Sequence, residues 1–94
     1  MTQATTTTLT MDNLKKCFSR AWDNNANYIG IAVSIPFSSA EEVIINPAGN
    51  FAKKLAYYTE AYDDDLQLIK APGIRITGFT YGDSYAEIEK KLFG

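Results

Sequence analysis

Apolar residues recur at helical spacing near the start of the chain. The positions i, i+3, i+4, i+7 and i+8 are filled by Leu14, Cys17, Phe18, Ala21 and Trp22. They form one apolar face of an α-helix. Thr10 is well placed as the N-cap, and Leu9 and Leu14 have the spacing of a hydrophobic staple. The pattern predicts an amphipathic helix whose apolar face includes Cys17 and Trp22.

Two further patterns occupy the middle of the chain. The first has period two, with one strongly apolar face made by Ile29, Ile31, Val33, Ile35 and Phe37. It predicts a strand, and residues 41–46 are expected to return beside it as an antiparallel hairpin. After a turn rich in Asn, Pro and Gly, the second pattern predicts a helix with an apolar stripe of Phe51, Leu55, Tyr58 and Tyr62.

The last third of the chain predicts a short strand over residues 66–70 and another over residues 74–80. In the latter, Ile74 and Ile76 are expected on one face and Phe79 on the other. Ser84 and Glu87 have the spacing of a capping box, which opens a final helix. The stripe of that helix is made by Tyr85, Ile88 and Leu92.

The predicted order is α-β-β-α-β-β-α, an α+β fold. We expect one four-stranded, mainly antiparallel sheet with helices packed on it. Residues 1–8 are expected to be a disordered polar tail, and residues 9–94 a single α+β domain. With 94 residues, of which 46% are hydrophobic, the chain is long enough for one core without metal or disulfide staples.

The composition excludes several kinds of active site but does not identify a function. The chain has no histidine, so the usual Ser-His-Asp and Cys-His arrangements are excluded. It also has no glycine-rich phosphate loop, and Cys17 has no histidine to activate it. We therefore expect a protein that is not an enzyme, with no catalytic, cofactor-binding or metal-binding residues.

The location and the class of partner follow from similar observations. A lone cysteine fits a reducing, cytoplasmic setting, and no apolar run approaches the length that spans a bilayer. The net charge of −2 lacks the basic excess usual in general nucleic-acid binders. We expect a protein partner, which includes a second copy of the chain as a homodimer, rather than nucleic acid or a membrane.

Tyrosines and acidic residues gather in the second half of the chain. The residues predicted to bind a partner are Tyr57, Tyr62, Asp63, Asp64, Asp65 and Tyr81. Tyrosine favours interfaces because it adds apolar area and a hydrogen-bonding tip. Two other interpretations of the acidic run stay open: a solvated helix end, and a site for a hard cation such as calcium.

Lysines occur in three pairs, each on a predicted helix: Lys15 and Lys16, Lys53 and Lys54, and Lys90 and Lys91. Solvated helix faces explain the pairs. A phosphate-contacting surface is the alternative if the pairs converge in space. This leaves open a nucleic-acid-associated accessory protein, and a carboxylate- and metal-dependent hydrolase is a third hypothesis.

The chain also resembles a known type of protein. Its single compact domain, its opening helix, its lack of a catalytic set and the closing stretch from Gly82 to Glu89 resemble the small acidic accessory proteins encoded by phages and prophages. The resemblance implies action by binding a host or defence protein. The leading expectation is thus a non-enzymatic protein-binding module, phage-encoded and acting as a modulator or inhibitor.

Overall fold

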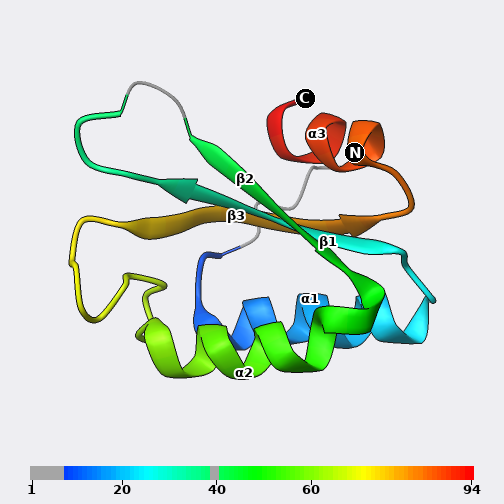
Figure 1. The fold of residues 1–94 in the computed structure, drawn as a ribbon, viewed down its shortest axis with the longest axis horizontal. Helices are drawn as coiled ribbons and strands as arrows, with labels where there is room; N and C mark the ends of the chain where they lie inside the picture. The colour runs from blue at the N-terminus through cyan, green and yellow to red at the C-terminus, as the bar shows by residue number, and fades with distance from the viewer. Residues whose placement is uncertain (1–7, 39–40) are drawn as a thin grey trace.

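A three-stranded antiparallel sheet lies at the centre of the structure, a computed structural model that describes residues 8–38 and 41–94. The strands, in the spatial order β2-β1-β3, are β1 (Tyr28–Ser34), β2 (Glu42–Pro47) and β3 (Arg75–Gly82). The helices are α1 (Met11–Asp23), α2 (Phe51–Ala61) and α3 (Tyr85–Phe93), with a 3₁₀ turn at Ala48–Asn50. The α+β class is confirmed (Figure 1).

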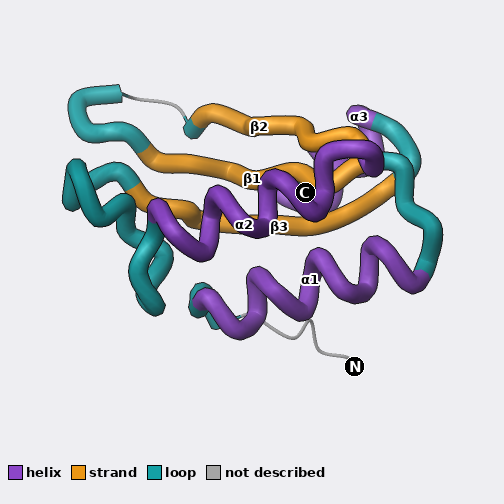
Figure 2. The backbone as a smooth tube through the Cα atoms, turned by 60° about the horizontal axis from the view of Figure 1, so that its bottom comes forward, coloured by secondary structure: helices purple, strands orange, loops and turns teal. Residues whose placement is uncertain are grey.

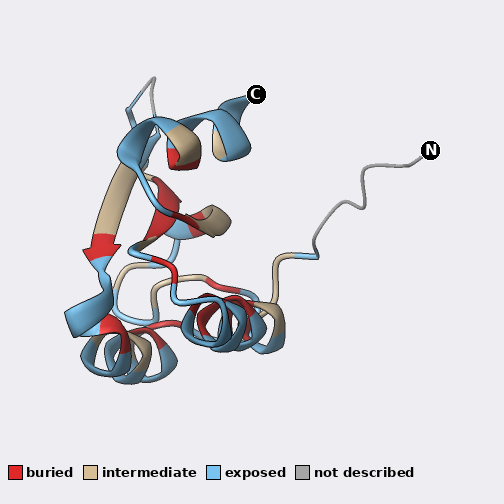
Figure 3. Ribbon diagram, turned by 90° about the vertical axis from the view of Figure 1, so that its right-hand side faces the viewer, coloured by how far each residue is buried: buried red, intermediate tan, exposed pale blue. Residues whose placement is uncertain are grey.

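The helices divide between the two faces of the sheet. α1 and α2 lie side by side across one face, and α3 crosses the other (Figures 1 and 2). The main core lies between the sheet and the α1–α2 pair, where buried positions of the strands and helices meet (Figure 3). Ile29, Ile31 and Val33 of β1 point into this core, each less than 5% exposed.

The first helix begins as predicted. The Thr10 hydroxyl accepts a hydrogen bond from the Asn13 amide at 3.2 Å, which satisfies one free donor of the helix start. Leu14 and Cys17 are buried, but Trp22 is 64% exposed, so its predicted burial is wrong. At 100° per residue Trp22 lies roughly 80° around the helix from Leu14, at the edge of the apolar stripe.

The hairpin of β1 and β2 is antiparallel as predicted, with Tyr28 opposite Pro47 and Val33 opposite Glu42. The first strand, however, ends at Ser34 and does not continue to Phe37. Phe37 takes a left-handed conformation, with φ of 67°, and is fully exposed. The alternation of apolar and polar residues continues to Phe37, three residues past the end of the strand, and so it predicted a strand that was too long.

The second predicted strand pair is only half present, so the four-stranded sheet is wrong. Residues 66–70 form isolated bridges and turns rather than a strand. Leu66 has a φ of 63°, which breaks extended backbone, and the Ala71 amide donates to the Leu68 carbonyl in a turn. The Leu66 side chain is nevertheless fully buried and contributes to the core.

A register shift in β3 changes which face Phe79 occupies. Ile76 pairs with Val33, and Phe79 pairs with Ile31, with the shift between Ala32 and Val33. An extra residue in one strand reverses the alternation beyond it. Phe79 and Ile76 therefore lie on the same face, toward α1 and α2, contrary to the sequence prediction.

Most of the predicted tail lies outside the described residues, so its boundary stays a prediction. Of the predicted tail at residues 1–8, only Thr8 lies within the described residues, and its carbonyl accepts a hydrogen bond from Asn13 Nδ2 at 2.8 Å. Along residues 8–38 and 41–94, no helix combines the length and the apolar character that a membrane crossing requires.

Candidate functional site

A groove of about 350 Å³ separates the C-terminal half of α1 from the N-terminal half of α2. Phe18 and Phe51 supply its aromatic floor, each 3% exposed, with ring centroids 6.0 Å apart in an edge-to-face arrangement. Leu55 contributes from α2. Ser19 and Asp23 give the α1 side a polar margin. The groove is therefore an apolar trough with hydrogen-bonding groups along one edge.

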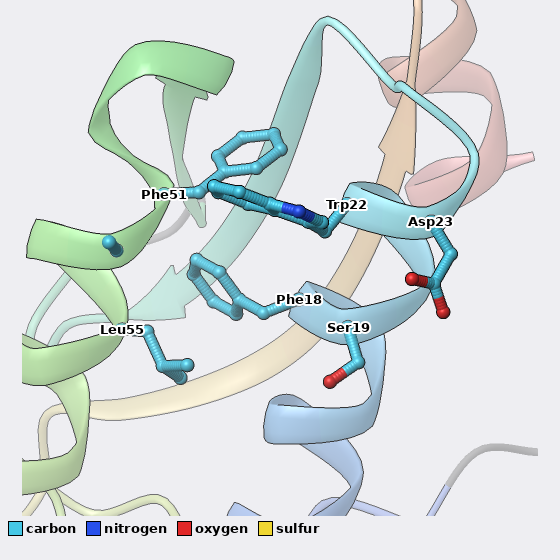
Figure 4. A pocket seen from close by; sticks show the side chains of 7 residues that line it. Phe18, Ser19, Trp22, Asp23, Phe51 and Leu55 are labelled. Atoms are coloured by element: carbon cyan, nitrogen blue, oxygen red, sulfur yellow. The ribbon is translucent and has the colours of Figure 1, made fainter.

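Trp22 is the most prominent side chain of this groove. Its indole reaches from α1 toward Phe51, on the same side of the helix as Phe18 (Figure 4). The same indole also lines a neighbouring hollow of about 430 Å³ that Asn27 and Gly49 help to form. Because Trp22 borders both hollows and is 64% exposed, an incoming group can reach it from two sides.

Sequence reasoning missed this surface because it assigned all five residues of the helix stripe to the core. One signal pointed the other way: Trp22 is the last residue of the stripe and is followed at once by Asp23, Asn24 and Asn25, which stop the helix. A large side chain at the end of a stripe, next to polar turn residues, has less of the core to pack against.

The predicted tyrosine cluster is real, but only one of its rings faces solvent. Tyr58 and Tyr62 are buried, whereas Tyr57 is 48% exposed. The Tyr57 ring lies 5.2 Å from that of Tyr58 and 6.4 Å from that of Tyr62, and Lys54 Nζ stands 5.6 Å from its centroid. Burial raises the pKa of Tyr62. Tyr57 is thus the exposed ring among Tyr57, Tyr58 and Tyr62.

The acidic run forms an ordered turn. One carboxylate oxygen of Asp63 accepts hydrogen bonds from the amides of Asp65 and Gln67, at 2.9 and 3.0 Å. The Asp64 carbonyl accepts one from the Met11 amide at 3.0 Å. Asp63 therefore shapes the backbone, and the exposed side chains of Asp64 and Asp65 are the ones open to a partner.

Tyr81 lies apart from the rest of the predicted set. Arg75, at the start of β3, bridges to Gln67 beside the acidic turn, while Tyr81 is near the other end of that strand. Its ring lies 5.2 Å from Lys91 Nζ, and its hydroxyl accepts a hydrogen bond from Asn24 Nδ2 at 3.4 Å. The structure does not bring Tyr81 together with Tyr57.

The lysine pairs do not converge. Two pairs lie on α1 and α2, on one face of the sheet, and the third lies on α3, on the other face. Within the third pair, Lys91 donates to the Tyr81 carbonyl at 2.8 Å and pairs with Glu87 at 3.0 Å. A phosphate-contacting surface would require the three lysine pairs to converge, and they do not.

Cys17 lies on the buried side of α1 as predicted, 8% exposed. Burial raises the pKa of its thiol to about 11, and the nearby charges of Arg20 and Lys91 only partly offset that effect. At neutral pH the reactive thiolate is a very minor species. Cys17 is a core side chain in this fold.

Across the part of the chain that the structure describes, no three acidic or cysteine side chains are grouped closely enough to hold a metal ion. Comparisons of the chain with known protein families, with curated proteins and with solved structures gave no match. The functional argument therefore depends on the groove, Trp22 and the exposed residues of α2.

Proposed function

We propose that this chain is a non-enzymatic protein-binding module and that the groove between α1 and α2 is its binding surface. The single observation that carries the proposal is the exposure of Trp22 over an aromatic trough. A partner that covers the indole would gain a binding free energy of roughly 25 cal/mol for each Å² of apolar surface removed from water. Tryptophan is also the residue type most enriched among interface hot spots.

The shape and chemistry of the groove define the kind of partner. Its floor fits one large apolar side chain that packs against Phe18 and Phe51. The carboxylate of Asp23, at the α1 margin, suits a basic or hydrogen-bonding residue beside that apolar one. The occupant is therefore a segment of another protein with an apolar anchor next to a positive charge.

The resemblance to phage accessory proteins extends the proposal to a host or defence protein as the partner, with this chain as its modulator or inhibitor. A nucleic-acid-associated role remains the alternative, and no contact among the described residues favours it. The exposed acidic residues Asp64 and Asp65 add a local negative charge that suits a basic protein.

The test compares Trp22→Ala with Tyr85→Ala in capture from extracts of the native host. Tyr85 is a matched control because it is 62% exposed and lies on α3, across the sheet from the groove. Wild type and Tyr85→Ala should retain the same protein, and Trp22→Ala should bind it roughly 30-fold more weakly, as expected for a hot spot.

Purified partner then allows a direct measurement. Trp22 is the only tryptophan of the chain, so its fluorescence reports on the groove alone when the partner lacks tryptophan or carries a non-fluorescent analogue. Binding should shift its emission to shorter wavelength as the indole leaves water. Equal affinity for wild type and Trp22→Ala, or an unshifted emission at saturation, would overturn the proposal.

A further inference from the structure

Another hollow, of about 580 Å³, lies beside the C-terminal half of α2. Its two walls are formed by Tyr57, Glu60 and Ala61 of α2 and by Leu68, Ile69 and Lys70 of the segment before β3. The Ile69 amide donates to the Ala61 carbonyl at 2.9 Å. A backbone hydrogen bond thus holds the two walls of the hollow together.

This hollow is separate from the groove that Trp22 borders. Leu55 lines the groove and Tyr57 lines the hollow, and these two residues lie roughly 160° apart around the helix. The two sites therefore open on different sides of α2, and they share no lining residue. The hollow is a candidate binding site in its own right.

The apolar lining of the hollow is poorly covered by the chain itself. Ile69 is 57% exposed and Tyr57 is 48% exposed. Ala61 and Leu68 lie deeper and pack against the core, so they form an apolar floor. A group that covers these side chains removes apolar surface from water, which favours binding.

Each wall of the hollow also carries one charge, Glu60 on α2 and Lys70 on the other segment. Both side chains are exposed, and neither forms an ion pair within residues 8–38 and 41–94. The site therefore combines an apolar floor with one acidic and one basic wall. Its occupant should carry an apolar side chain between a base and an acid.

The outward side of α3 has this arrangement. Phe93 is 53% exposed, and the exposed residues Glu89 and Lys90 lie one turn before it. Around the helix, Glu89 is roughly 40° to one side of Phe93 and Lys90 is roughly 60° to the other. All three line one stretch of surface on the exposed side of α3 (Figure 3). An apolar ring thus lies between an acid and a base.

The other charged pair of α3 is bound within the chain. Glu87 accepts a hydrogen bond from the Asp83 amide at 2.9 Å and pairs with Lys91 at 3.0 Å. In the part of the chain that the structure describes, Glu89 and Lys90 form no such pair. One side of α3 therefore holds the helix to its own sheet, and the other presents Phe93 with two unpaired charges.

We infer that α3 of one copy of the chain docks into the hollow of a second copy. Phe93 lies between the two walls, with Lys90 beside Glu60 of the second copy and Glu89 beside Lys70 of the second copy. A chain does not fill its own hollow in this way, because α2 and α3 lie on opposite faces of the sheet (Figure 1). The two surfaces differ, so the contact is head-to-tail and each added copy presents a further hollow.

The first experiment is sedimentation of the full chain over a concentration series. The mean mass of the wild type should rise past that of a dimer, since a head-to-tail contact does not stop at two copies. Phe93→Ala and Ile69→Asp, both at exposed positions, should each weaken the association roughly 30-fold. Lys16→Glu, at an exposed position of α1, is the control and should behave like the wild type. A thermal melt of each variant confirms that it folds.

A mixing experiment tests the head-to-tail geometry. The Phe93→Ala chain keeps an intact hollow, and the Ile69→Asp chain keeps an intact α3. Each should be monomeric alone at a concentration where their mixture forms a dimer of one copy of each and nothing larger. A mixture that associates no better than the single variants overturns the inference, as does a wild type that stays monomeric at high micromolar concentration.

Charge exchange tests the pairing across the contact. Lys70→Glu and Glu89→Lys should each weaken the association roughly fivefold, and the two together in one chain should restore it because the signs are exchanged. Failure of this rescue overturns the inference. So does loss of association in Trp22→Ala, because the contact would then lie in the groove. Capture of another protein through Trp22 is measured separately, and its failure leaves this result unaffected.

Discussion

Gly30 of β1 lies directly against Ile88 of α3. A Cβ atom built at Gly30 would overlap Cγ2 of Ile88, so only glycine allows α3 to approach the sheet this closely. Gly30→Ala should therefore destabilise the protein by about 2 kcal/mol, as for an overpacked core. In a domain of this size the loss lowers the Tm by roughly 8–16 °C, which differential scanning calorimetry would detect.

The control for that change is Gly49→Ala. A Cβ at Gly49 meets no atom within 4 Å, so the free energy of unfolding should change by less than about 0.5 kcal/mol. Removing the obstructing methyl with Ile88→Ala should cost less in the Gly30→Ala background than in the wild type. Additive effects of the two substitutions would contradict the proposed overlap.

The cap of α3 should make stability depend on pH in the acid range. The Asp83 amide donates to Glu87 Oε1 at 2.9 Å, and Lys91 lies 3.0 Å from the other oxygen. Together these partners, the amide first, lower the pKa of Glu87 below its usual value of 4.5. The ionised Glu87 carboxylate therefore stabilises the fold fully above pH 4.5, and this stabilisation is lost as the pH falls through the pKa of Glu87 in the folded protein.

Glu87→Gln should remove this acid dependence, as measured by urea unfolding at a series of pH values below about 5. Ser84→Ala tests the other half of the cap, since the Ser84 hydroxyl accepts from the Glu87 amide at 3.1 Å. It should cost about 1 kcal/mol at neutral pH. Glu89→Gln, on the same helix, should leave the acid dependence as it is in the wild type.

A buried phenol predicts a second pH dependence, in the alkaline range. Tyr58 is 1% exposed, and its burial raises its pKa to about 12, partly offset by the nearby Asn46 carboxamide. Because the pKa of Tyr58 is higher in the folded protein than in the unfolded chain, its neutral phenol stabilises the fold fully below about pH 10. This stabilisation is lost as the pH rises through about 12. Tyr58→Phe should reduce this loss in alkaline denaturation.

At neutral pH the same substitution should be neutral or slightly stabilising. Among residues 8–38 and 41–94, neither the Tyr58 hydroxyl nor Asn46 Oδ1 has a hydrogen-bond partner within normal distance, so no hydrogen bond from these residues offsets the burial of the phenol. The ring contact with Phe18, at 6.2 Å between centroids, is retained by phenylalanine. Tyr85→Phe is the surface control. A loss of more than about 1 kcal/mol in Tyr58→Phe would indicate a hydrogen bond that the geometry does not show.

The backbone at Phe37 offers a stabilising change. Its φ of 67° is costly for a bulky residue, and its side chain gains nothing from burial because it is fully exposed. Phe37→Asn, which tolerates this region better, should raise the free energy of unfolding by about 0.5–1 kcal/mol. Thermal unfolding measures the change, and Phe37→Val, which suits this conformation even less, should have the opposite effect.

Local patterns predicted the helices and the hairpin well because their determinants are local. Thr10 and Ser84 cap the helices that their spacing indicated, and the alternation around Ile31 describes the buried side of β1 correctly. The errors arose where the backbone departs from regular geometry. The left-handed Leu66 ended an expected strand, and the register shift beside Val33 moved Phe79 to the other face.

The candidate site was harder to predict because exposure depends on tertiary packing. The apolar stripe of the second predicted helix includes Tyr58 and Tyr62 but not Tyr57, and Tyr57 is the one of the three that faces solvent. Trp22 shares a stripe with Leu14, but the groove to α2 leaves its indole uncovered. The exposure of Trp22 does not follow from spacing along one helix, since it depends on where the second helix lies.

The central position of β1 has a consequence for the order of folding. β1 pairs with β2 through a short connection, whereas its partners in β3, such as Gly82 opposite Tyr28, are distant in sequence. Closing the longer loop costs more chain entropy, so the hairpin should form early and the second ladder late. β1 amides, bonded into both ladders, should then exchange their hydrogens with solvent most slowly in the sheet, and β2 amides at the open edge fastest.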